Sequence, residues 1–250
     1  MSNEELEKLD QEIRDTFMNL PEAFQARDMA DSVVDSPSLI VTRLCVYFIY
    51  HKCLCVLHRK YVTRGSPKSL QACYGSSSEL VRRFLDMYKE FEPGGQLETQ
   101  RWFMGSATWH DFLLACATLC LTICYSRQGL HELDVTSVVD VPVCLMMLKE
   151  AKRVCEEQSS RRKGTGKVQR LIEATILKCD LSNETPTMYY SFQNGQIDVP
   201  GTNWHANIPS QENTEIWSGS TPNLTSTSVD DAGWIFLYQY LDLPNDEMMS

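Results

Sequence analysis

Apolar residues recur at three- and four-residue spacing along most of the first 180 positions. At the start of the chain, Ser2 followed by Glu5 is a capping-box pattern, in which each residue satisfies a backbone N–H of the first helical turn. An apolar stripe then runs from Leu6 to Leu20. This pattern predicts an amphipathic helix that ends before Pro21.

Two later stretches are apolar on all sides of a helix rather than on one face. Ser36 and Pro37 supply a cap and a first-turn proline for a helix over about 38–61. The second half of a predicted helix over about 99–126 has the same all-round apolar character. Polar residues interrupt both stretches, leaving them short of the ~20 apolar residues that a membrane span needs. We therefore expect two core helices.

Three more segments carry a helical stripe, over about 67–91, 140–155 and 168–179. Ser66-Pro67 supplies the start signal of the first, and Asp140 with Pro142 that of the second. Proline and glycine separate them, and no strand alternation of useful length or internal repeat occurs before residue 180. The predicted fold class is therefore all-α, a helical bundle of about six main helices.

The composition changes after residue 180, where Asn, Ser, Thr, Pro and Gly dominate as far as Gly233. Positions 1–179 hold 23 acidic and 23 basic side chains, whereas positions 180–250 hold 10 acidic and no basic ones, so the tail carries the whole net charge of −10. We predict a helical domain at 1–180 and a largely disordered, acidic, aromatic-containing tail at 181–250. A neutral body also lacks the field that attracts nucleic-acid phosphates, which makes direct DNA binding doubtful.

The last part of the tail places aromatic side chains among acidic ones. A segment of this kind can fold when it meets an apolar groove on a partner, which makes it a candidate activation segment. Its residues are Asp230, Asp231, Trp234, Phe236, Leu237, Tyr240 and Leu241.

A basic run lies between the fifth and sixth predicted helices. A solvated loop is one interpretation, and a nuclear-import address is the functional alternative. The run consists of Arg161, Arg162, Lys163, Lys167 and Arg170.

Residues with metal-binding or catalytic chemistry do not form a recognisable set. The face carrying His51, Cys55 and His58 and the thiols spaced by four from Cys116 to Cys124 are each more typical of helix packing than of a zinc site. His110 and Asp111 are adjacent and cannot face each other on a helix, so a capping or interhelical polar role is expected. We predict no catalytic residue, no cofactor and no metal.

The N-terminus lacks the basic start and apolar run of a secretory signal. The ten cysteines are then expected to be reduced thiols inside the cell, mostly small core residues.

Several runs in the helical body resemble the regulatory middle homology region of fungal zinc-cluster transcription factors, over about residues 36–180. They are 57–62, Ser66-Pro67 leading to Cys73, the run from Trp109 to Ala115, and 119–121. The resemblance implies a regulatory role in the nucleus. The family's DNA-binding head has six closely spaced cysteines, whereas this chain has no cysteine before Cys45 and no such spacing.

Three hypotheses follow. In the first, the chain is a transcription-regulator-like protein tied to a specialised (secondary) metabolite gene set; its body forms homo- or heterodimers or binds an effector, and its tail recruits transcription machinery. In the second, it is a truncated, dominant-negative partner of a full-length zinc-cluster factor. In the third, it is a helical small-molecule binder or enzyme, favoured by a pocket that joins His58, His110 and acids from separate helices.

Overall fold

The computed structural model describes residues 2–127, 139–160, 162, 164–184 and 241. Within these residues there are six α-helices, three short 3₁₀ segments and no strand, which confirms the all-α prediction. The elements are α1 (Asn3–Met18), η1 (Glu22–Phe24), η2 (Ala30–Ser32), α2 (Pro37–Val62), α3 (Pro67–Lys89), η3 (Glu98–Met104), α4 (Ser106–Arg127), α5 (Val141–Gln158) and α6 (Thr165–Glu184).

Polar caps start the helices where the sequence predicts. Ser2 and Glu5 form the reciprocal capping box of α1. The hydroxyls of Ser36 and Ser66 each accept a backbone N–H of the first turn of α2 and α3, and the Asp140 carboxylate does the same for α5. Each of these three helices has a proline in its first turn, where no N–H is needed.

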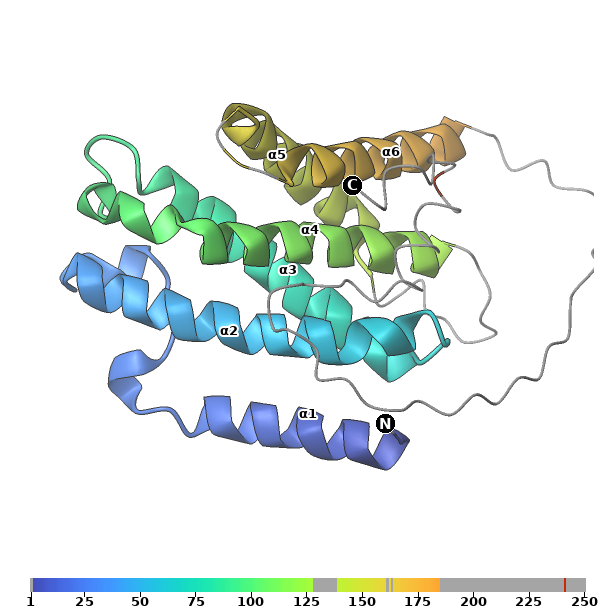
Figure 1. The fold of residues 1–250 in the computed structure, drawn as a ribbon, viewed down its shortest axis with the longest axis horizontal. Coiled ribbons are helices and arrows are strands. Elements are labelled where there is room, and N and C mark those ends of the chain that lie inside the picture. Colours follow the sequence, from blue (N-terminus) through green and yellow to red (C-terminus); the bar gives the residue numbers. More distant parts are fainter. Residues whose placement is uncertain (1, 128–138, 161, 163, 185–240, 242–250) are drawn as a thin grey trace, which may run out of the picture.

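Helices α2, α3 and α4 form the centre of the bundle, with α5 and α6 on one side and α1 on the other (Figure 1). An aromatic cluster joins α3 to α4 in the core. The rings of Phe84 and Phe112 stack with centroids 3.9 Å apart, and Trp109 packs edge-on against Phe84. The run from Trp109 to Ala115 that carries the family resemblance is therefore largely a core element.

Two helices, α2 and α4, are long and apolar enough to span a membrane by length and composition alone. The apolar window of α4 is 89% buried inside the protein and that of α2 is 44% buried. α4 is thus a core helix, as predicted, and α2 is shared between the core and the N-terminal side of the bundle.

The predicted helix over 99–126 differs from the structure. Residues 98–104 form η3, and Gly105 has an extended backbone (ψ −176°) that separates η3 from α4. Glycine is a poor helix former, and the break lets Phe103 and Met104 enter the core before α4 begins.

The predicted boundary between domain and tail at residue 180 falls inside α6, which runs to Glu184. Of the later residues, the structure describes Leu241, which is buried and belongs to the core cluster. The rest of the predicted tail lies outside the described residues.

Candidate functional site

A groove of about 1570 Å³ lies between α1 and α3, with α2 as its floor. Polar residues of α1 and of the first half of α3 form its walls, and the second half of α2 contributes histidines, tyrosines and Leu54. Leu6 of α1 and Leu54 are buried in its base. The groove therefore has an apolar base, while most of the residues that line it are polar or charged.

His51 lies on the floor of the groove and is only 9% exposed. Its ring packs between the rings of Tyr47 and Tyr50, at centroid distances of 4.3 and 4.8 Å. Its Nδ1 is buried and has no hydrogen-bond partner among the described residues. Burial lowers the pKa of His51 to about 4, so the imidazole is neutral at neutral pH.

His58, two turns further along α2, has partners on both ring nitrogens. Nε2 lies 2.8 Å from Oδ1 of Asp10 on α1, and Nδ1 lies 3.2 Å from Oγ of Ser69 on α3. The Asp10 carboxylate also accepts from Arg14 at 2.7 Å. Burial raises the pKa of Asp10, but the hydrogen bonds from Arg14 and His58 outweigh it and leave the pKa below its usual value.

Asp10, His58 and Ser69 are the residue types of a nucleophilic catalytic triad, but the complete burial of Ser69 argues against that role. The Ser69 residue is 0% exposed, so a substrate carbonyl has no approach to its hydroxyl. What the three side chains do is join α1, α2 and α3 to one another. A second link between α1 and α3 is the ion pair of Glu7 with Lys68 at 2.7 Å.

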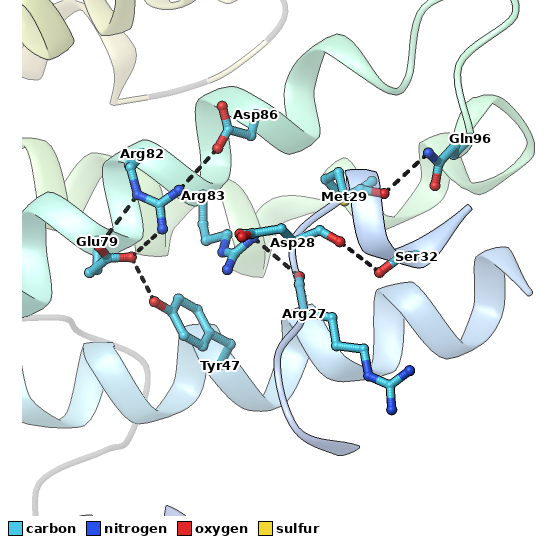
Figure 2. Close-up of polar contacts among 10 residues, drawn as sticks. All are labelled: Arg27, Asp28, Met29, Ser32, Tyr47, Glu79, Arg82, Arg83, Asp86 and Gln96. Carbon is cyan, nitrogen blue, oxygen red and sulfur yellow. Dashed lines mark hydrogen bonds and ion pairs between the residues drawn. The ribbon is translucent and has the colours of Figure 1, made fainter. Parts of the chain in front are cut away.

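At the other end of the groove, Glu79 on α3 accepts the Tyr47 hydroxyl of α2 at 2.8 Å and pairs with Arg82 at 2.7 Å (Figure 2). Arg82 also reaches Asp86 on the same helix. The Tyr47–Glu79 hydrogen bond thus fixes α2 against α3 directly beside His51.

Two buried arginines hold the segment that connects α1 to α2. Arg83 of α3 contacts the Asp28 carboxylate at 2.7 Å and donates to the backbone carbonyl of Arg27 (Figure 2). Arg43 of α2 donates to the carbonyl of Ala23 and pairs with Asp35. These contacts fasten the connection across the bundle and so position α1 as a wall of the groove.

The predicted basic run is only partly described. Arg162 is half-buried, with its guanidinium 5.2 Å above the ring of Trp109. Lys167 and Arg170 lie in α6, and each interacts with another group of the protein. Arg161 and Lys163 lie outside the described residues, so the import address stays a prediction.

The candidate activation segment is described at one position, the buried Leu241. Its other residues, Asp230, Asp231, Trp234, Phe236, Leu237 and Tyr240, lie outside the described residues.

The other candidate side chains act in packing. Asp111 of α4 pairs with Lys52 of α2 at 2.6 Å, which confirms the predicted interhelical role, whereas His110 is exposed and does not line the groove. Cys116, Cys120 and Cys124 are buried on one face of α4, and burial raises the pKa of Cys120 to about 12. Within the described part of the chain, no three His, Cys, Asp or Glu side chains gather as metal ligands would.

Helical spacing places His51 and His58 on one face of α2, but the groove is not apparent from the sequence. The partners of His58 come from 48 residues earlier and 11 residues later in the chain, and helical periodicity does not reveal such pairings. A sequence feature that points toward these partners is the spacing of Glu7, Asp10 and Arg14, which places three charged residues on one face of the first helix.

Comparison with known proteins confirms the resemblance to fungal zinc-cluster transcription factors. The chain is 28% identical to the Zn(2)-C6 fungal-type transcription factor pigI of Monascus ruber, over 46% of this chain and 15% of the relative. It is 27% identical to the equisetin cluster transcription factor eqxF of Fusarium heterosporum, over 69% of this chain and 25% of that protein. For the fusarisetin A cluster transcription factor fsa6 of Fusarium sp. (strain FN080326), the identity is 25%, over 69% of this chain and 23% of the relative.

The chain thus spans a quarter or less of the length of these relatives. No family model matches it. No solved structure matches it either.

Proposed function

We propose that this chain is a nuclear, transcription-regulator-like protein that acts through protein–protein contacts in the control of a specialised-metabolite gene cluster. The observation that carries the proposal is its similarity to several regulators that are named for such clusters. In this proposal the helical bundle is the regulatory part, and the acidic segment after residue 180 contacts the transcription machinery. A homodimer, or a heterodimer with a longer relative, is part of the same proposal.

The charge distribution supports a mechanism based on protein contacts. Positions 1–179 carry equal numbers of acidic and basic side chains, and many of those described form ion pairs with one another. A body of this kind offers little excess positive charge for binding a phosphate backbone. The acidic, tryptophan-containing segment that follows is suited instead to a groove lined by apolar and basic residues.

A tethered reporter tests this function. The whole chain is fused to a heterologous DNA-binding domain in yeast, and transcription from the matching promoter is measured. We expect activation, and we expect the double substitution Trp234→Ala with Phe236→Ala to remove most of it, because aromatic anchors dominate contacts of this type.

The matched control for the reporter is Trp102→Ala. Trp102 is a 69% exposed tryptophan in η3, remote in sequence from the acidic segment, and its removal should leave activation unchanged. A fusion that accumulates in the nucleus without activating or repressing the reporter would count against the proposed function. Equal activity of the parent and the Trp234/Phe236 variant would remove the acidic segment from it.

A further inference from the structure

We propose that the outer face of α2 binds the same face of a second copy of this chain, with the two α2 helices antiparallel. Ile49 and Cys53 lie two residues before and two residues after His51, whose side chain lines the groove. A helix turns by about 100° per residue, so both side chains lie on the side of α2 that faces away from the groove. Ile49 is 58% exposed, and Cys53 is also exposed.

A single stripe of side chains runs along this outer face. Its members follow one another at alternating spacings of four and three residues, the spacing that keeps a seam of side chains facing a partner helix in coiled coils. Val56 is 45% exposed, Val46 is half-buried, and the residues at both ends of the stripe are polar and exposed. The stripe, called the α2 stripe below, consists of Thr42, Val46, Ile49, Cys53, Val56 and Lys60.

The bundle leaves much of the apolar surface of α2 uncovered. The apolar window of α4 is 89% buried, whereas the comparable window of α2 is 44% buried. α1 and α4 lie on either side of α2, and α3 packs behind it (Figure 1). The α2 stripe lies on the remaining side. Association that covers its apolar side chains removes them from water, which stabilises the complex.

Symmetry and charge favour a second copy as the occupant of this face. The six positions are symmetric about residue 51, so reversing one helix brings Ile49 opposite Cys53 and valine opposite valine. Lys60, the one charged member of the α2 stripe, then faces Thr42. A parallel pair would instead place Lys60 beside its own copy, and contact between like charges is destabilising. The antiparallel arrangement is thus a self-complementary twofold contact.

The net charge of the helical body permits this contact, and its size predicts a weak dimer. Positions 1–179 carry equal numbers of acidic and basic side chains, so two bodies do not repel each other through net charge. From Thr42 to Lys60 the α2 stripe is about 27 Å long. A contact along one helix covers less than the ~800 Å² per partner of a standard interface. We therefore expect a dissociation constant in the micromolar range.

A regulatory effect of this dimer rests on the proposed function, whereas self-association does not. The two can therefore fail separately. Association is measured on the purified chain, and activation is measured with the reporter.

The experiment is analytical ultracentrifugation of the purified full chain between about 1 and 100 µM, where we expect a reversible monomer–dimer equilibrium. Ile49→Glu should raise the dissociation constant by at least about a hundredfold, because each dimer would bury two carboxylates in an apolar seam. The substitution replaces an exposed side chain, so the monomer should keep its fold. The matched control is Met146→Glu on α5, at a 65% exposed position, which should associate like the parent.

Disulfide formation tests the orientation of the two helices. Ile49→Cys places a thiol opposite Cys53 of the second copy in the antiparallel pair. Diamide, which oxidises two thiols to a disulfide, should then join two copies covalently. Met146→Cys should stay unlinked. A parallel pair would instead link the parent chain through Cys53.

Three results would overturn the proposal. The first is a parent chain that stays monomeric across this concentration range. The second is a dimer with the same dissociation constant in Ile49→Glu as in Met146→Glu, which would place the contact on another face. The third is covalent linkage of the parent at the yield of Ile49→Cys, which would contradict the antiparallel arrangement.

Discussion

His51 and His58 show what the environment of one residue adds to its position in the sequence. They lie two turns apart on α2 and are both buried, but His58 is hydrogen-bonded on both nitrogens, while Nδ1 of His51 has no partner within the described part of the chain. Helical periodicity predicted their common face. It did not predict this difference, because the partners of His58 come from α1 and α3.

The pH dependence of stability should report the burial of His51. Its pKa is about 4 in the folded protein, against 6.5 for an ordinary histidine. Between these values the unfolded chain takes up a proton that the folded protein does not, so folding loses stability as the pH falls from about 6.5 toward 4. Above pH 6.5 both states are neutral, and His51 adds no pH dependence.

Urea unfolding at pH 7.5 and pH 5 tests this expectation. Protonation of His51 in the unfolded chain should lower the free energy of unfolding of the parent by about 2 kcal/mol between pH 7.5 and pH 5. In His51→Gln this decrease in the free energy of unfolding should be absent. His110→Gln, at an exposed position, should show the same decrease as the parent. An equal loss in the parent and in His51→Gln would contradict the assignment of a buried, neutral imidazole.

At the scale of elements, caps and prolines made the starts of α1, α2, α3 and α5 predictable from the sequence, because these signals are local. The break at Gly105 was missed, since an apolar pattern continues through it while the backbone does not. The connection between α1 and α2 was also unpredicted. Its position depends on Arg43 and Arg83, which bind it from helices later in the chain.

The two arginine contacts of this connection should differ in strength. The Asp35 side chain, paired with Arg43, is 15% exposed, whereas the Asp28 side chain, paired with Arg83, is 63% exposed. Asp35→Ala leaves a buried guanidinium without its counter-ion and should lower the free energy of unfolding by about 3 kcal/mol. Arg83 is about as buried as Arg43, but it also donates to the Arg27 carbonyl, and water screens the exposed Asp28 carboxylate, so Asp28→Ala should cost less, about 1 kcal/mol.

Chemical denaturation at neutral pH measures both variants. Asp28→Ala also serves as the matched control for a general effect of removing an acid from this connection. If the two variants lost equal stability, the connection would not be held mainly by the buried Arg43 pair.

For the whole molecule, the structure joins a helical core to an N-terminal helix held by polar contacts and by Phe17, whose ring stacks on Tyr50 of α2 at a centroid distance of 3.9 Å. α4 is buried on nearly all sides, while α1 has one buried residue, Leu6, and is linked through Asp10, His58 and Lys68. The groove lies between this helix and the core. An element with few buried side chains opens locally at a lower free-energy cost than the core does.

The family resemblance belongs to this scale as well. The runs that carry it contribute core residues of α2, α3 and α4, such as Val62, Leu70 and Trp109. Several groove residues, among them His58, Tyr61 and Ser69, lie within these runs, but the runs do not show that α1 lies opposite them. The sequence therefore indicated the class of protein but not the site.

The most direct test of the regulatory role is the measurement of transcripts after controlled expression of the chain in the organism that encodes it. The control is Trp109→Arg, which places a charge in the aromatic core and should prevent folding. We predict that the parent chain, and not the variant, changes transcript levels across a contiguous set of biosynthetic genes. Unchanged transcripts in cells whose nuclei contain the folded protein would contradict the account.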